Sequence, residues 1–184
     1  MQNVLDICCG TGDQVFYYSQ KGLTATGVDK NLTMISQAEN KRRKKDLNDV
    51  DFYIAHAADL PFRDGHFDSA SITLGLHEMN EKERDNVISE MKRVVKKGGT
   101  LIFIDFQVPF PTTPAAFLIR IVELIAGKDN YRYFRNYLAH GGLRTILSRN
   151  QLNPQKQTTI KFGLLEVIEA NNPLLIAWSD NSPH

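Results

Sequence analysis

The sequence has few cysteines and lacks long apolar runs. Its only two cysteines, Cys8 and Cys9, are adjacent, which suits neither the C-x-x-C spacing of redox and zinc sites nor an unstrained disulfide. Because no second group of cysteines and histidines completes a four-ligand site, we expect no metal. No stretch approaches the roughly 20 apolar residues of a transmembrane helix, so no membrane span is predicted.

The chain also lacks a large charge of either sign. It carries 22 Lys and Arg against 21 Asp and Glu, a net charge of +1, so no strong field attracts nucleic acid or an anionic membrane. The basic run 41–45 falls at the end of an expected helix, where cations complement the helix dipole. The N-terminus shows no basic region followed by an apolar one, so we expect a cytoplasmic protein without a signal peptide. At 184 residues, 42% of them hydrophobic, the chain fits one domain.

Short apolar runs alternate with segments of helical periodicity, a pattern typical of a doubly wound α/β fold with a mostly parallel sheet. Strands are expected over 3–8, 24–29, 51–57, 67–74, 100–106, 158–169 and 174–179. Helices are expected over 13–20, 32–44, 115–126 and 142–149, with another between the Asn80 cap and Gly98. The short link "NNP" between the last two strands predicts an antiparallel hairpin, so the final strand of seven should run against the others.

The segment "VLDICCGTGD", residues 4–13, indicates a strand followed by a glycine turn that opens a helix. A P-loop would need a lysine after its glycines, and none is present. A dinucleotide fingerprint would need a small residue where this chain has Val15. This mismatch disfavours an NAD-dependent oxidoreductase, which remains the alternative function. Asp6, Asp29 and Asp59 are expected around one crevice, where they favour a ligand with a ribose, amines and a positive centre over a pyrophosphate.

Five segments in register resemble the motifs of class I S-adenosylmethionine-dependent methyltransferases, nearest the ubiquinone/menaquinone-biosynthesis and related small-molecule groups. They are "VLDICCGTGD", "GVDKNLTMI", "AADLPF", "GHFDSASITLGLHEM" and "VVKKGGTLIFIDF", which together cover residues 4–106. The resemblance implies a Rossmann-like methyltransferase fold, with S-adenosylmethionine as cofactor and S-adenosylhomocysteine as product. It further implies methyl transfer to a small, partly apolar or aromatic acceptor. A protein that binds the cofactor without catalysis is the alternative from another class.

The same resemblance implies individual cofactor contacts. The methionine end, with its sulfonium, would lie against Asp6, Cys8, Gly10, Thr11, Gly12, Leu74 and Gly75. Asp29 would accept hydrogen bonds from the ribose hydroxyls, and Lys30 and Met34 would flank the ribose and adenine. Asp59 would accept from the adenine amino group, with Leu60 beside the ring.

The acceptor is expected beneath the insertion 107–150, on the side of the sheet that the cofactor motifs leave open. The residues expected to bind it are His77, Asp105, Tyr131 and Tyr133. His77 is the candidate general base because it is a titratable group just past the fourth strand; Glu78, Asp105 and His140 are weaker candidates. Family members usually carry N-terminal helices that cap this site. The first strand is expected to begin almost at Met1, so we expect one of three arrangements: an open cleft, a cleft closed by another segment or subunit, or a shortened chain. A homodimer is one way for a subunit to close it.

Overall fold

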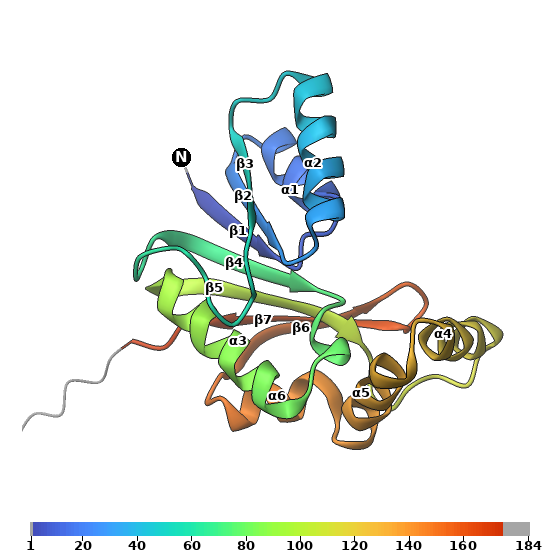
Figure 1. The fold of residues 1–184 in the computed structure, drawn as a ribbon. Helices are drawn as coiled ribbons and strands as arrows, with labels where there is room; N and C mark the ends of the chain where they lie inside the picture. Colours follow the sequence, from blue (N-terminus) through green and yellow to red (C-terminus); the bar gives the residue numbers. More distant parts are fainter. Residues whose placement is uncertain (1, 175–184) are drawn as a thin grey trace, which may run out of the picture.

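The computed structural model describes residues 2–174 and contains a seven-stranded sheet with helices on both sides (Figure 1). The strands are β1 (Asn3–Ile7), β2 (Thr24–Asp29), β3 (Val50–Ile54), β4 (Phe67–Thr73), β5 (Val95–Phe106), β6 (Pro154–Ile160) and β7 (Leu165–Asn171). Their order in the sheet is β3-β2-β1-β4-β5-β7-β6. The first five strands are parallel, and β7 is antiparallel to both β5 and β6. The predicted fold class is therefore confirmed.

Three of the six described helices begin at a side-chain cap, and the other three follow a glycine. They are α1 (Asp13–Gln20), α2 (Leu32–Lys45), α3 (Glu81–Val94), α4 (Pro114–Ile125), α5 (Lys128–Ala139) and α6 (Gly142–Arg149), with a 3₁₀ turn η1 (Leu76–Glu78). The side chains of Asn31, Asn80 and Thr113 each accept a hydrogen bond from a backbone N–H in the first turn of the helix that follows. Such caps satisfy donors that have no partner within the helix, which fixes where the helix starts.

The core lies on both sides of the central strands. Helices α1 and α2 pack against the β1–β3 half of the sheet, whereas α3 and α6 contact β5 (Figure 1). The fully buried side chains at the centre include Leu5, Phe67, Ile72, Ile88, Met91, Leu101 and Phe103. This packing holds the carboxyl ends of β1, β2, β4 and β5 at one edge of the sheet.

The C-terminal hairpin differs from the prediction. The segment 158–169 is not one strand, because a turn at 161–164 divides it into the end of β6 and the start of β7. Lys161, Phe162 and Gly163 in this turn all have positive φ, and two of the three are residues that rarely adopt such angles. The hairpin therefore does not turn at "NNP". Leu174 lies in no strand, and the rest of the expected strand 174–179 is outside the described residues.

Two further differences from the prediction concern the start of β5 and the segment after α4. Strand β5 starts at Val95, directly after α3, and runs through Gly98 and Gly99, which were expected to follow the helix as a stop. A Cβ at Gly99 would lie 2.5 Å from the Asp68 carbonyl oxygen, so the close strand pairing needs glycine there. The aromatic stretch after α4, to which no element was assigned, forms α5.

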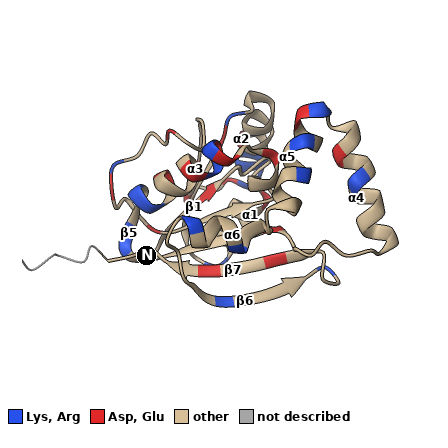
Figure 2. Cartoon of the chain, turned by 90° about the horizontal axis from the view of Figure 1, so that it is seen from below, with Lys and Arg blue, Asp and Glu red and all other residues tan. Residues whose placement is uncertain are grey.

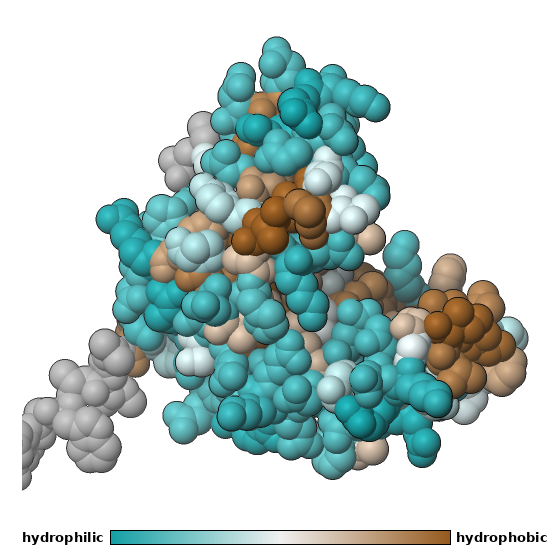
Figure 3. Space-filling model, viewed as in Figure 1, coloured by the Kyte–Doolittle hydropathy of each residue, from teal (hydrophilic) through white to brown (hydrophobic). Residues whose placement is uncertain are grey.

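Helix α4 lies at the edge of the molecule and exposes most of its apolar side chains (Figure 3). The side chains more than half exposed are Phe117, Leu118, Val122, Leu124 and Ile125. Only Ala116 and Glu123 of this helix are buried. Within the described part of the chain, we find no helix whose length and apolar character would let it cross a bilayer.

Candidate cofactor and acceptor site

A cavity of about 300 Å³ opens at the carboxyl ends of β1, β2 and β4. Residues that line it include Cys8, Asp29, Lys30, His56, Leu74, Gly75, Glu78 and Asn130. Ligands of doubly wound sheets bind at this edge of the strands, and pockets for small molecules start at about this volume. The fold thus places a ligand-sized space where the sequence motifs converge.

The glycine turn after β1 is held against Asp29. The Gly10 N–H donates to Asp29 Oδ2 at 2.9 Å, and the Asn31 N–H donates to Oδ1 at 2.8 Å. Gly12 has a φ of +80°, and a Cβ there would lie 2.6 Å from the Phe52 ring, so glycine is required on two counts. One carboxylate therefore orients both the turn and the start of α2, at the wall of the cavity.

Asp6 lies behind the turn and is buried. Its Oδ1 accepts a hydrogen bond from the Ser71 hydroxyl at 2.7 Å, and Ser71 in turn accepts one from the Tyr18 hydroxyl at 3.0 Å. Burial raises the pKa of the Asp6 carboxyl to about 7; the Ser71 hydrogen bond opposes this shift and the charge of Asp29 adds to it. The Asp6 side chain is thus bound to β4 within the sheet, and it is not among the residues that line the cavity.

Of the other expected cofactor residues, Cys8, Lys30, Leu74 and Gly75 line the cavity together with Asp29. Those outside its wall are Gly10, Thr11, Gly12, Met34, Asp59 and Leu60. Leu60 is buried in the core, and its backbone N–H donates to Glu90 Oε2 at 2.7 Å. Asp59 is exposed and forms a backbone bridge with His56, whose own side chain lines the cavity.

Beside the cavity, three chain segments bring together a buried group of ionisable side chains. His77 Nδ1 in η1 lies 2.7 Å from Asp105 Oδ1 at the end of β5. The backbone N–H of His77 also donates to Asp105 Oδ2 at 3.1 Å. His77 Nε2 lies 3.6 Å from Glu123 Oε1 on α4 and 4.0 Å from Glu78 Oε1. The exposed fractions of His77, Asp105 and Glu123 are 2%, 1% and 8%.

These neighbours control the protonation of His77. Burial of the imidazole lowers its pKa, but the charges and hydrogen bonds of Asp105 and Glu123 outweigh burial and raise the pKa to about 10. Burial also raises the pKa of Glu78. In this arrangement His77 is a proton donor at neutral pH. The expected role as a general base requires one of its carboxylate partners to be displaced or neutralised.

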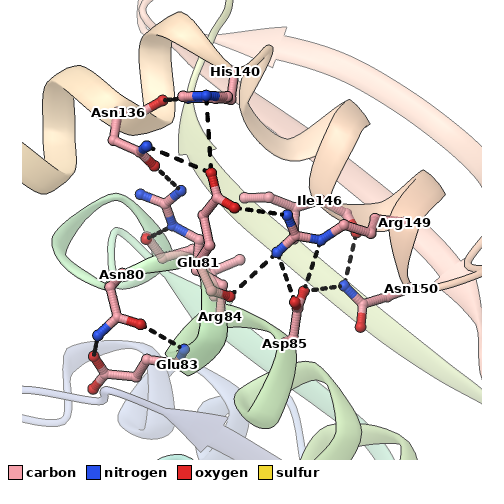
Figure 4. Close-up of polar contacts among 11 residues, drawn as sticks. Asn80, Glu81, Glu83, Arg84, Asp85, Asn136, His140, Ile146, Arg149 and Asn150 are labelled. Carbon is pink, nitrogen blue, oxygen red and sulfur yellow. Dashed lines mark hydrogen bonds and ion pairs between the residues drawn. The ribbon is translucent and has the colours of Figure 1, made fainter.

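Arg84 connects this group to α5. Its buried guanidinium donates to the Leu76 carbonyl at 2.8 Å, to the Tyr133 carbonyl at 3.0 Å and to Asn136 Oδ1 at 2.9 Å. Figure 4 shows how Arg149 extends the same network from α6 to Glu81 and Asp85 on α3. Helix α5, part of the insertion expected to cover the acceptor, is therefore fixed to η1, the element that carries His77.

The two expected tyrosines fall in different places. Tyr131 lines a second, open groove of about 680 Å³ between residues 108–110, α4 and α5. The cations of this groove are Arg120, Lys128, Arg132 and Arg135, on the α4–α5 side of the molecule in Figure 2. Tyr133 lines neither space; its hydroxyl lies 3.3 Å from Arg132 Nη2. His140 is exposed on the surface, away from His77, beside Glu81.

Sequence reasoning missed Glu123 and Asn130, the latter on the cavity wall. Glu123 did carry a signal, since it is the only acidic residue of an otherwise strongly apolar helix. A lone acid at such a position is costly to bury without a partner, which indicates a specific contact.

The strand order, the glycine turn and the cavity at the strand ends are those of a class I methyltransferase domain. Residues 4–99 match the sequence profile of a methyltransferase domain family. The chain belongs to this family, as the five motifs predicted.

Several curated relatives are named as quinone methyltransferases. The chain is 34% identical over 133 residues to a demethylmenaquinone methyltransferase of Renibacterium salmoninarum, covering 70% of this chain and 53% of that protein. It is 38% identical over 146 residues to a ubiquinone/menaquinone biosynthesis C-methyltransferase of Erwinia tasmaniensis, covering 72% and 57%. The chain thus spans a little over half the length of these relatives.

Solved structures support the fold. A protein from Pyrococcus horikoshii superimposes with a TM-score of 0.73 at 17% identity, covering 92% of this chain and 82% of that one. A methyltransferase from Methanosarcina mazei has a TM-score of 0.70 at 23% identity, covering 94% and 93%. At these identities the likeness concerns the arrangement of strands and helices.

Proposed function

We propose that the chain binds S-adenosylmethionine in the cavity at the ends of β1, β2 and β4. It would transfer the methyl group to a small, partly apolar or aromatic acceptor. The observation that carries this proposal is the position of Asp29. It lies on the cavity wall and accepts a hydrogen bond from the Gly10 N–H of the glycine turn. Membership of the methyltransferase family supports it.

The residues present fit this cofactor. Each Asp29 oxygen accepts one backbone hydrogen bond and retains capacity for a ribose hydroxyl. A Cβ at Gly75 would lie 3.1 Å from Cys8 Sγ, so the absence of a side chain there keeps the cavity open between the two. We assign the methionine end to Cys8, Gly10, Thr11 and Gly12, and the sulfonium to Leu74 and Gly75. Lys30 and Met34 would flank the ribose and adenine. Asp59 and Leu60 would lie beside the adenine, as the motif resemblance implies.

Methyl transfer requires no covalent intermediate on the protein. Bound S-adenosylmethionine supplies the methyl group and the leaving group together, so the chain has to align the acceptor and exclude water. Glu78 lines the cavity and also faces His77. We place the reacting atom of the acceptor near Glu78, with the aromatic rings of Phe106, Phe110 and Phe134 behind it, where they contact one another at ring-centroid distances of 5.4–5.6 Å.

The acceptor class follows from the relatives. Two of them carry the names of quinone methyltransferases. The second groove is lined by Phe110 and Tyr131, and aromatic side chains of this kind suit an aromatic ring. We therefore propose an aromatic acceptor with ring oxygens, such as a hydroquinone. No nucleic-acid acceptor is proposed, because the cations of the second groove are too few to form a nucleic-acid track.

Calorimetry and labelled-methyl transfer test the proposal together. S-adenosylhomocysteine should bind, and at 100 times its Kd it should add about 2.7 kcal/mol to the free energy of unfolding. Asp29→Ala should weaken that binding at least tenfold, about 1.4 kcal/mol. Asp51→Ala is the matched control, because it removes an exposed carboxylate of β3 that does not line the cavity.

The alternatives predict other results. Binding of NAD in place of S-adenosylhomocysteine would identify a dehydrogenase-type site. Cofactor binding without methyl transfer to hydroquinones, phenols, amines or thiols would identify a non-catalytic binding protein.

A further inference from the structure

The geometry points to a site for a divalent transition-metal cation formed by His77, Glu78 and Glu123. One ligand atom from each residue, His77 Nε2 and a carboxylate oxygen of each glutamate, lies within 4.8 Å of the other two. The separations from Nε2 are 3.6 Å to Glu123 and 4.0 Å to Glu78. Two ligands each about 2.0–2.2 Å from a zinc-like ion lie roughly 3–4 Å apart, so only small movements would bring all three into contact with one ion.

The far side of the imidazole is arranged like that of a metal-ligating histidine. Asp105 Oδ1 lies 2.7 Å from Nδ1, which orients the ring so that Nε2 points at the two glutamates. Asp105 is itself held by the backbone N–H groups of His77 and Phe106 at 3.1 and 2.8 Å. Carboxylate–histidine pairs of this kind fix the tautomer and orientation of metal ligands.

Glu123 provides an independent observation. Its side chain is nine-tenths buried, and its Oε2 has no hydrogen-bond partner among the described residues 2–174. A buried carboxylate oxygen without a partner is costly. Three carboxylates, those of Glu78, Asp105 and Glu123, surround one imidazole. The nearby Arg84 donates to two backbone carbonyls and an amide oxygen, and to none of these carboxylates. A divalent cation bound at Nε2 would release the proton that His77 carries there and balance this excess of negative charge.

The ligand set defines the class of ion. One imidazole with carboxylates suits Zn²⁺, Mn²⁺, Fe²⁺ or Co²⁺, whereas soft thiolate-preferring ions are disfavoured. The sequence expectation of no metal considered only local cysteine and histidine spacing, and Glu123 is too far along the chain for such a pattern to include it.

The site also suggests a use for the ion, and this step rests on the proposed function. Glu78 belongs both to the ligand set and to the wall of the cofactor cavity. A position left open on the ion would therefore face the acceptor. It would bind an anionic ring oxygen, a phenolate or enolate, beside the methyl group that the cofactor presents.

Direct metal binding tests the site without requiring turnover. Metal-free protein titrated with Co²⁺ should bind one ion per chain and develop visible absorption bands of a low-symmetry site. Glu123→Gln and Glu78→Gln should each weaken Co²⁺ binding at least tenfold. Glu81→Gln is the matched control, because His140 Nε2 and Glu81 Oε1 form a surface pair at 3.9 Å; it should leave the affinity unchanged.

Binding of S-adenosylhomocysteine by the same samples separates the two proposals and reports folding. Wild-type protein that binds S-adenosylhomocysteine but not Co²⁺ would overturn the metal site alone. Equal Co²⁺ affinity in wild type and both glutamine variants would also overturn it, because the ion would then bind elsewhere. If Glu123→Gln does not fold, Glu78→Gln decides the question, because Glu78 is exposed and its substitution should not prevent folding. Stoichiometric Co²⁺ without any S-adenosylhomocysteine binding would support the metal site and contradict the proposed function.

Discussion

The cofactor end and the acceptor end of the site are built by different means. At the cofactor end, Asp29 contacts the backbone N–H groups of Gly10 and Asn31, so main-chain turns shape the wall. At the acceptor end, His77, Asp105 and Glu123 meet through side-chain contacts from η1, β5 and α4. The first end therefore depends on which residues allow a tight turn. The second depends on buried charged side chains, each of which is stable only while its charged partners are present.

The largest difference between the ends should appear when a buried charge loses its partner. Asp105→Ala removes the group closest to the His77 ring and should lower the free energy of unfolding by about 3–5 kcal/mol. Urea denaturation measures this effect. Asp51→Ala, which removes an exposed carboxylate of β3, is the control and should leave stability nearly unchanged. Equal effects of the two substitutions would mean that the acceptor-end charges do not stabilise one another.

The cofactor end has one buried charge of its own, and pH should reveal it. Because the pKa of Asp6 is raised to about 7, folding favours its protonated form. The stabilisation is complete below about pH 4 and is lost as pH rises through 7. We expect the free energy of unfolding of wild type to fall by a few kcal/mol over this range relative to Asp6→Asn. Urea denaturation of both proteins at several pH values measures the difference, and parallel pH profiles would contradict it.

Two neighbouring glycines sharpen the claim that backbone shape governs the cofactor end. Gly10→Ala places a side chain in open space at φ +53° and should cost about 1–2 kcal/mol for the left-handed conformation. Gly12→Ala carries the same penalty and also meets the Phe52 ring at 2.6 Å, which should add about 1 kcal/mol or more. Urea denaturation should therefore rank Gly12→Ala as the less stable. The reverse order would show that this contact relaxes freely.

The same contrast explains how far the sequence could predict the molecule. Glycine turns, helix caps such as Asn80 and the acid that ends β2 depend on residues close in sequence, so local patterns locate them. Glu123 was missed because its partner, His77, lies in another element, and no local pattern joins α4 to η1. The turn at 161–164 was missed because Lys161 and Phe162 adopt positive φ, which their side chains disfavour and a propensity argument cannot anticipate.

The smallest expected effects concern the two tyrosines of α5, and they decide how far the acceptor end extends. Tyr131 lines the open groove, whereas Tyr133 lines neither space and has its backbone carbonyl held by Arg84. Tyr131→Ala should lower kcat/KM for the acceptor about tenfold, about 1.4 kcal/mol, and Tyr133→Ala should lower it by less. In both variants the affinity for S-adenosylhomocysteine should stay within about threefold, a change below 1 kcal/mol. A larger loss with Tyr133→Ala than with Tyr131→Ala would mean that acceptor binding depends on the packing of α5 and not on the groove that Tyr131 lines.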